Sequence, residues 1–369
     1  MEQNLNILIC PLEWGLGHSG RSIVLAKKLR SSGNNILIGA GREHLEFFRK
    51  ELPGLTFIDF PGYKPHYSRY LPQYLKLLLD VPVLIYHSAK EHKNLKRIIR
   101  EHSIDIVISD NRFGLWNNEV RSVYITHMPR IPFPAFFRFL EFIGILLHRM
   151  IIKRYSLCFI PDLPGELNVS GRLSHGLRLP SNVRYIGLLS RFSDFDADSN
   201  ANTLNVAHNT VILSGPEPQR GILKRKLYDI FREKEPVTVF LGGKPDGAGE
   251  MSMEDNIIWY DHPDAAQMKD LILTSKTIIA RAGYTSIMEL ISLGRRALLI
   301  PTPGQTEQEY LARSLSEKGW FSFMPQKKTD KEFTPSSVEP GWPDELIAQS
   351  NLYLGKALEE LLKQQKQNS

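Results

Sequence analysis

The stretch from Thr277 to Ala312 constrains the fold of this chain more than any other part of the sequence. A short β-branched run at Thr277–Ala280 predicts a buried strand. Gly283 interrupts that run, and the apolar residues from Ile287 to Leu293 fall at helical spacing. Ala297–Ile300 then predicts a second buried strand. Strand, glycine turn, helix and strand together form the repeating unit of a parallel α/β sheet.

Polar side chains gather around the turn that follows the first of these strands. Thr285 and Ser286 favour a helix start, where unpaired N–H groups and the helix dipole attract a phosphate. Glu289 lies one helical turn deeper on the same face, where its carboxylate can accept hydrogen bonds from both hydroxyls of a ribose. Glu307 and Gln308 follow the next strand at the same sheet edge. The pattern predicts a site for a nucleotide that carries a polyhydroxylated group.

The same residues resemble the donor-site signature of GT-B glycosyltransferases. The resemblance is closest to the family 28 C-terminal domain, typified by the peptidoglycan enzyme that moves N-acetylglucosamine from UDP onto a membrane lipid. That signature spaces a basic residue, a glycine, small hydroxyl residues and a glutamate, followed by a proline-led loop that ends in an acidic residue and a glutamine. The matching positions in this sequence are Arg281, Gly283, Thr285, Ser286, Glu289, Pro301, Glu307 and Gln308.

The resemblance implies an α/β protein of the GT-B class. Two Rossmann-like βαβ domains would face a central cleft, and a C-terminal helix would return to the first domain. A chain of 369 residues is expected to form about two domains, and its alternating strand and helix patterns favour parallel sheets. We expect an acceptor-side domain at 1–188, a linker at 189–209, a nucleotide-sugar domain at 210–343 and the returning helix at 344–369.

Three further expectations concern local boundaries. The helix after the first strand is expected from about Arg21 to Arg30. A long helix is expected from Pro72 to Arg100, with a kink at Pro82. The short run Val183–Ile186 is assigned to the link between the domains.

Composition narrows the possible partners. The content of 42% hydrophobic and 23% charged residues is ordinary for a globular protein. The net charge of +6 suits an anionic substrate or an anionic membrane surface, and no basic run with interleaved aromatics indicates nucleic acid. Cys10 and Cys158 lie in apolar runs, so we expect buried thiols and a cytoplasmic protein. The first ten residues are too short and uncharged for a signal peptide and predict a strand.

The glycine-containing segment after the first strand, Gly15–Arg21, is the candidate catalytic loop. Gly17 allows close approach of the backbone on the acceptor side. His18 can take a proton from an attacking hydroxyl, because the pKa of histidine lies near neutral pH. The alternative is a helix-capping histidine without chemistry. Glu13 and Trp14 depart from the run of glycines usual in the family.

Asp110 and His127 each end a predicted strand. Several inverting GT-B transferases hold their histidine with an aspartate at such a position, so the resemblance implies a dyad of His18 and Asp110. Asp110 would orient the imidazole and stabilise its protonated form. The alternative for Asp110 is a turn or helix cap. His127 can face the acceptor or pack as an ordinary loop residue.

The second domain offers further candidate contacts to the donor. Ser214 and Gly215 follow its first strand, where their N–H groups can reach a diphosphate. Pro216 and Pro218 remove nearby N–H donors, so residues 242–243 are an alternative lining.

Two other side chains of this domain are candidates for donor contacts. Arg220 can add positive charge near the diphosphate, and Trp259 can stack on a base or pack in the core, of which we favour the core.

We expect neither a metal nor another cofactor. The acidic segment 194–198 lies in the polar linker, and GT-B transferases generally stabilise the leaving diphosphate with the helix dipole and basic residues.

The stretch Ile131–Lys153 is rich in phenylalanine and basic residues. Its charges argue against a membrane-spanning helix, but a basic amphipathic helix can lie in a membrane interface. The alternative is a buried core helix.

Together these features predict a glycosyltransferase of hexosyltransferase type. It would move a sugar, N-acetylglucosamine among the candidates, from a UDP-sugar to an acceptor hydroxyl by inverting displacement. A lipid-linked cell-envelope acceptor and peripheral binding to the inner face of the plasma membrane are part of this interpretation. A nucleotide-sugar hydrolase of the same fold and a non-catalytic nucleotide-sugar-binding subunit are the alternatives. The sequence identifies neither the sugar nor the acceptor.

Overall fold

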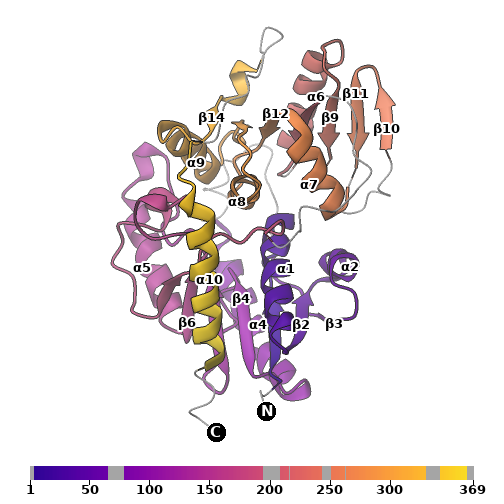
Figure 1. Ribbon diagram of the computed structural model, residues 1–369. Coiled ribbons are helices and arrows are strands. Elements are labelled where there is room, and N and C mark those ends of the chain that lie inside the picture. Colours follow the sequence, from indigo (N-terminus) through magenta and orange to yellow (C-terminus); the bar gives the residue numbers. More distant parts are fainter. Residues whose placement is uncertain are drawn as a thin grey trace. The chain divides into compact units, whose positions relative to one another are not determined.

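The structure is a computed structural model that describes residues 4–64, 79–193, 208–215, 217–242, 251–261, 263–329 and 341–363. The chain divides into two compact units, each built on one seven-stranded sheet with helices (Figure 1). Among the described residues, unit 1 contains 4–64, 79–189 and 344–363, and unit 2 contains those from 190 to 343. The predicted α/β class with two Rossmann-like sheets is confirmed.

The sheet of unit 1 is parallel throughout, with strand order β3-β2-β1-β4-β5-β6-β7. Its central strands are buried and mostly apolar, as parallel sheets covered by helices require. The strands are β1 (Asn6–Cys10), β2 (Asn35–Ala40), β3 (Thr56–Asp59), β4 (Ile106–Asp110), β5 (Arg121–Ile125), β6 (Leu157–Ile160) and β7 (Val183–Tyr185).

The α-helices described in unit 1 are α1 (Leu16–Ser31), α2 (Arg42–Glu51), α4 (Val81–Glu101), α5 (Leu140–Ile152) and α10 (Glu345–Lys363). Three short 3₁₀ turns are also present, at Ala135–Phe137, Gly165–Leu167 and Gly171–Leu173. Buried side chains of α4, such as Leu95 and Ile98, pack against Leu8 and Val107 of the central strands.

Three local expectations for unit 1 are wrong. α1 begins at Leu16 instead of Arg21, because Gly15, with φ of 139°, lets the chain enter a helix directly after the loop. Pro82 does not kink a helix interior; it lies in the first turn of α4, where its missing N–H is not needed. The residues of β7, expected in the link between the domains, instead form a strand that pairs with β6. The expected helical residues 72–78 lie outside the described part.

The C-terminal helix α10 (yellow in Figure 1) belongs to unit 1. Arg184 of β7 donates from Nε and Nη2 to the two carboxylate oxygens of Glu360, both at 2.9 Å. The Leu188 N–H donates to Ser350 Oγ at 2.6 Å. Gly187 has a φ of 75°, and a Cβ there would lie 2.3 Å from the Ser350 carbonyl oxygen, so only glycine allows this close approach. The predicted return of the C-terminal helix to the first domain is therefore observed.

Unit 2 has strand order β10-β11-β9-β8-β12-β13-β14; among its described strand pairs, β10–β11 is antiparallel and the others are parallel. The strands are β8 (His208–Ile212), β9 (Thr238–Leu241), β10 (Met251–Glu254), β11 (Ile257–Tyr260), β12 (Ser275–Ala280), β13 (Leu298–Leu299) and β14 (Ser322–Phe323). Sequence analysis did not predict β10, whose residues are all exposed at the sheet edge.

The helices described in unit 2 are α6 (Gln219–Phe231), α7 (Ala265–Thr274), α8 (Tyr284–Ser292) and α9 (Thr306–Glu317), with a 3₁₀ turn at Gln326–Lys328. Leu223, Leu227 and Phe231 of α6 pack on the central strands. Asp264 begins α7 with a capping box, since its carboxylate accepts from the Gln267 N–H and the Gln267 side chain accepts in return. Of the expected linker 189–209, only 189–193 and 208–209 are described.

Candidate functional site

In parallel α/β sheets, ligands bind beyond the carboxyl ends of the strands, at the point where the strand order reverses. In unit 1, β2 and β3 lie on one side of β1 and β4 to β7 lie on the other, so this point lies between β1 and β4. In unit 2 it lies between β8 and β12. Most of the predicted site residues follow these four strands, which makes the two edges the candidate site regions.

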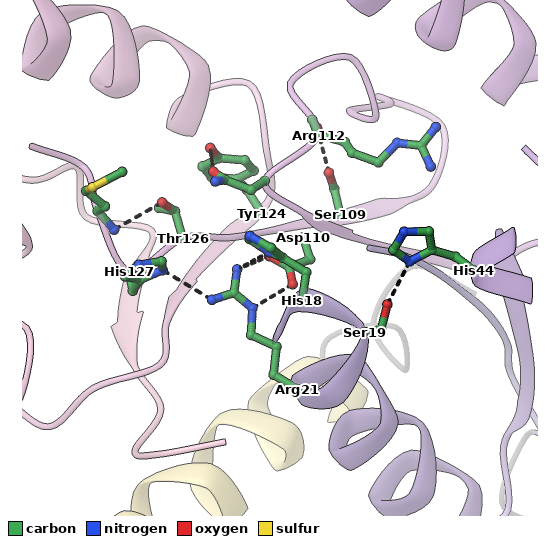
Figure 2. A network of polar contacts seen from close by, with 12 residues as sticks. His18, Ser19, Arg21, His44, Ser109, Asp110, Arg112, Tyr124, Thr126 and His127 are labelled. Atoms are coloured by element: carbon green, nitrogen blue, oxygen red, sulfur yellow. Dashed lines mark hydrogen bonds and ion pairs between the residues drawn. The ribbon is translucent and has the colours of Figure 1, made fainter. Parts of the chain in front are cut away.

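His18 lies in the first turn of α1, just beyond the carboxyl end of β1. The structure brings it to Asp110, the last residue of the neighbouring strand β4, with 3.1 Å between His18 Nδ1 and Asp110 Oδ1 (Figure 2). Asp110 is fully buried, and the His18 side chain is 18% exposed. His18 and Asp110, the pair expected from the sequence, are therefore in contact, and His18 is the more exposed of the two.

Arg21 was not singled out from the sequence, yet it joins these residues. Its side chain is 1% exposed, and its Nε donates to Asp110 Oδ2 at 2.6 Å, while its Nη2 donates to Asp110 Oδ1. Nη2 also lies 2.7 Å from His18 Nδ1, and Nη1 lies 3.2 Å from His127 Nδ1 (Figure 2). One guanidinium therefore contacts the carboxylate and both histidines. The spacing of Arg21 from His18, one helical turn, is the only sequence signal that indicates it.

His127 is buried and follows β5 by two residues. Its Nδ1 faces Arg21 from the side opposite to Asp110, as Figure 2 shows. The structure thus places His127 in the same polar network as His18. Gly17 occupies the helix position immediately before His18.

Burial and charge act together on the ionisation of this network. Burial lowers the pKa of His18, Asp110 opposes this shift, and the positive charge of Arg21 adds to it. Burial alone would raise the pKa of Asp110, but Arg21 and then His18 outweigh it and hold the pKa below its usual range. The resting network therefore contains an ionised carboxylate, a guanidinium and a histidine that resists protonation.

Glu13, a departure from the family pattern, holds the surrounding loops together. Its buried carboxylate accepts from the Gly41 N–H at 3.0 Å and from the Gly62 N–H at 2.7 Å through Oε1. Trp14 donates from Nε1 to the Tyr63 carbonyl oxygen at 2.9 Å. These bonds connect the loops after β1, β2 and β3, so the two residues support the edge where His18 lies.

In unit 2, Arg281 follows β12 and is almost fully buried. Nη1 donates to the carbonyl oxygens of Ile300 and Pro301, each at 3.1 Å, and Nη2 donates to that of Gln219 at 2.8 Å. Burial lowers the pKa of Arg281 to about 10. The residue predicted to contact the donor therefore holds the ends of β12 and β13 against the start of α6.

The turn after β12 has the predicted form. Gly283 is the N-cap residue of α8, and Thr285 and Ser286 lie in the first turn. No side chain caps the helix start by a hydrogen bond. The positive end of the helix dipole lies at this turn.

Glu289 lies deeper on α8 and is buried. Its Oε1 is 2.8 Å from Arg191 Nε, a contact that sequence analysis did not anticipate. Arg191 also stacks on Phe192. The carboxylate proposed to bind a ribose is thus already held by a cation of the same unit.

The turn after β8 lies against the loop after β13. Gly215 has a φ of 94°, and a Cβ there would lie 3.6 Å from Thr302 Oγ1. Gln308 accepts from the Thr302 N–H at 2.9 Å, which shapes this loop, and Ser214 is half-buried beside the turn. Thr302 Oγ1 is a buried atom with no hydrogen-bond partner in the described residues.

The remaining predicted contacts differ in their environment. Glu307 lies in the first turn of α9. Arg220 donates to Glu217 Oε1 and to the Gly242 carbonyl oxygen at 2.8 Å, so its charge is already partnered. Trp259 packs against the core of unit 2, as favoured from sequence, and its ring centroid lies 4.5 Å from that of Phe240. Residues 194–198, Pro216 and Gly243 lie outside the described part.

Within the described ranges, no group of three or more histidine, cysteine, aspartate or glutamate side chains is placed to hold a metal ion. The expectation of a metal-independent reaction stays a prediction.

Residues 225–339 match the glycosyltransferase family 28 C-terminal domain, which confirms the resemblance predicted from the sequence. The chain is 25% identical over 347 residues to an uncharacterized glycosyltransferase of Methanosarcina acetivorans, with coverage of 86% of this chain and 84% of the relative. It is also 22% identical over 164 residues to a UDP-N-acetylglucosamine–N-acetylmuramyl-(pentapeptide) pyrophosphoryl-undecaprenol N-acetylglucosamine transferase of a Sulfurihydrogenibium species. That match covers 37% of this chain and 47% of the relative.

Solved structures share the fold over nearly the whole chain. The glycotransferase of kitacinnamycin superposes with a TM-score of 0.66 at 11% identity and covers 99% of this chain and 100% of its own. The calicheamicin glycosyltransferase CalG4 superposes with a TM-score of 0.61 at 13% identity and covers 97% of this chain and 98% of its own. The chain therefore has the GT-B fold of glycosyltransferases. Together with the match to the family 28 C-terminal domain and the Methanosarcina relative, this fold supports a transferase.

Replacing Asp110 with asparagine should destabilise the protein, because it leaves the buried Arg21 without its counter-charge. The free energy of unfolding should fall by about 3–5 kcal/mol. Since the folded pKa of Asp110 lies below the unfolded value of about 3.9, this stabilisation is present above about pH 4 and is lost as the pH falls. Urea unfolding at pH 7 and at lower pH measures both effects.

Glu360→Gln is the matched control, since it removes the carboxylate from the half-exposed pair with Arg184, which is worth about 0–1 kcal/mol. Equal losses in the two variants at pH 7 would contradict the importance of the Arg21–Asp110 pair.

Proposed function

We propose that the protein transfers a sugar from a nucleoside diphosphate sugar to an acceptor hydroxyl. The observation that carries this proposal is the position of the candidate residues in the two sheets. In each unit the candidate residues lie where the strand order of the sheet reverses. In unit 1 they are a histidine and a carboxylate, and in unit 2 they belong to the turn and helix start after β12. The family match to residues 225–339 supports the assignment of unit 2 to the donor.

The donor diphosphate would bind at the N-terminus of α8. The positive end of the α8 dipole suits an anion. The turn after β8, which contains Gly215, and the Thr302 hydroxyl in the loop after β13 lie at the same sheet edge. Because Arg281 is bonded to three carbonyl oxygens, we assign it the role of holding this edge in shape. The helix N-terminus would then stabilise the charge that develops on the leaving diphosphate.

We propose UDP as the nucleotide of the donor. One relative is named as a UDP-N-acetylglucosamine-related transferase, while a solved spinosyn rhamnosyltransferase with the same fold carries thymidine diphosphate. Glu289 would accept the ribose hydroxyls, with Arg191 holding its carboxylate in place. The sugar itself is not specified by these contacts.

His18 would act as the general base. In a single displacement, the acceptor oxygen attacks the anomeric carbon, its proton passes to His18 Nε2, and the bond to the diphosphate breaks with inversion. Asp110 is placed to stabilise the imidazolium that forms, because its ionised carboxylate lies 3.1 Å from Nδ1. The His18 side chain is partly exposed, which allows an acceptor to approach it.

The acceptor is proposed to be lipid-linked, on the evidence of an exposed apolar surface in unit 1. Phe136, Phe139 and Phe142 are 83%, 68% and 72% exposed. The buried residues of α5 are instead Ile152, His148 and Glu141, and Glu141 is paired with Arg172 at 2.9 Å. The helix thus turns apolar residues outward, the reverse of an ordinary surface helix. We call this surface, on the 3₁₀ turn η1 (Ala135–Phe137), α5 and the residues between them, the η1–α5 apolar face; it comprises Phe136, Phe139, Phe142, Ile143, Leu146, Leu147 and Met150.

Basic residues accompany this face, since Arg138, Lys153 and Arg154 are exposed in the same segment. No described helix is long and apolar enough to cross a bilayer. An exposed apolar face with nearby cations suits the interface of an anionic membrane. We therefore propose that the η1–α5 apolar face binds the membrane in which a lipid-linked acceptor resides.

Glu289→Ala should weaken UDP binding on the order of 10–100-fold, because charge-assisted hydrogen bonds worth roughly 1.5–3 kcal/mol are lost. Isothermal titration calorimetry with UDP, and with thymidine diphosphate for comparison, measures this loss. Arg191→Met is the control, since it breaks the same ion pair but keeps the carboxylate, and it should retain UDP binding. If both variants lose UDP equally, Glu289 acts only through its ion pair.

Replacing Phe136, Phe139 and Phe142 together with serine should release the protein from vesicles that contain phosphatidylglycerol. UDP affinity and thermal stability should be unchanged, because these side chains are exposed and belong to unit 1. Vesicle co-sedimentation measures the release. A triple serine variant at Met251, Met253 and Leu352, which are also exposed, is the control and should stay bound. Binding that persists in the phenylalanine variant would argue against a membrane role for this face.

A further inference from the structure

Arg21 contacts the two histidines and the carboxylate of unit 1, and its guanidinium determines which histidine nitrogens can carry a proton. A guanidinium carries only donors and stays charged at all relevant pH values. Nη2 lies 2.7 Å from His18 Nδ1 and Nη1 lies 3.2 Å from His127 Nδ1. A hydrogen bond at either place requires the imidazole nitrogen to accept. Both neutral rings must then carry their proton on Nε2.

This arrangement conflicts with the role of His18 as a base. A ring whose Nε2 already carries a proton cannot take another from an acceptor hydroxyl at that atom. For Nε2 to accept, the ring proton must be on Nδ1. The acceptor available to an Nδ1–H group is Asp110 Oδ1 at 3.1 Å. Arg21 and Asp110 therefore compete for the same nitrogen of His18.

We propose that Arg21 is a positioning residue that selects the tautomer of His18. While Nη2 donates to Nδ1, His18 is held with its proton on Nε2 and is inactive as a base. The base-competent form arises when Nε2 releases its proton to solvent and Nδ1 takes one up, now donating to Asp110. One proton moves between the nitrogens and the net charge is unchanged. The inference rests on the proposed function of His18.

The same residue also keeps Asp110 ready for this exchange. Its two bonds to the carboxylate hold the aspartate ionised and fix its orientation, so that Oδ1 remains beside His18. The charged and titratable groups that face His18 are Arg21 on its own helix, Asp110 at the end of β4 and His127 after β5. Arg21 contacts His18, Asp110 and His127.

Nitrogen NMR of protein labelled with ¹⁵N-histidine tests the inference without any substrate. The tautomer of a neutral imidazole is read from its two nitrogen shifts, and a His18→Gln sample identifies the signal of His18. In the unaltered protein at neutral pH, His18 is expected to carry its proton on Nε2. In Arg21→Met it is expected to shift to the Nδ1–H form. An Nδ1–H form in the unaltered protein would overturn the inference.

The pH dependence of transfer provides the second readout. Arg21→Met removes a positive charge beside His18, so the acidic limb of the pH–rate profile should move to higher pH by about one unit. Arg21→Lys keeps the positive charge and should move the acidic limb less than Arg21→Met does. Arg21→Lys is also the variant of choice if Arg21→Met does not fold.

Arg112→Met is the matched control. Arg112 is equally buried but is paired with Glu91 at 3.0 Å, so its loss should lower stability without changing the tautomer of His18 or the acidic limb. If Arg112→Met also changed the tautomer of His18 or moved the acidic limb, the effects of Arg21→Met would reflect a general loss of stability. If His18 has the expected tautomer but no transfer is found, the proposed function fails while the assignment of Arg21 to the tautomer stands.

Discussion

The buried pair of Arg21 and Asp110 is the interaction on which the candidate catalytic edge depends. Isolated charges are costly to bury, and such a pair is tolerated only when its hydrogen bonds are satisfied. Here the aspartate comes from the end of β4 and the arginine from α1, so their bonds hold the helix that carries His18 against the neighbouring strand. The position of His18 is therefore a consequence of an ion pair between segments distant in the sequence.

Unit 2 uses a buried arginine in a different way. Arg281 contacts three carbonyl oxygens, and burial lowers its pKa to about 10. Arg21 and Arg281 are the two largest fully buried side chains described in the chain. Each lies at the strand-order reversal of its own sheet, where backbone loops from several strands must be held together. One arginine organises ionisable side chains, whereas the other organises the backbone around a proposed anion site.

Sequence patterns predicted the strands and helices well where apolar runs were short and bounded by glycine or proline. The stretch β12–α8–β13 is an example, since its turn and helix start fall where Gly283 and Thr285 predict. β7 was misassigned because three half-buried residues carry too weak a pattern. Arg21 was missed because a helix arginine gives no sign of its burial, which arises from a partner 89 residues away. The pairing of Glu289 with Arg191 escaped prediction for the same reason.

The central claim is that His18 accepts the proton of an attacking hydroxyl while unit 2 holds the donor. The most direct test compares the unaltered protein with His18→Ala, using radiolabelled UDP-N-acetylglucosamine and other UDP-sugars with a bacterial lipid extract as acceptor. Transfer of label into the lipid phase should fall by about 10²–10⁴-fold, while UDP affinity stays unchanged. Equal transfer by both proteins would contradict the claim. UDP release at full rate without acceptor would instead indicate a hydrolase.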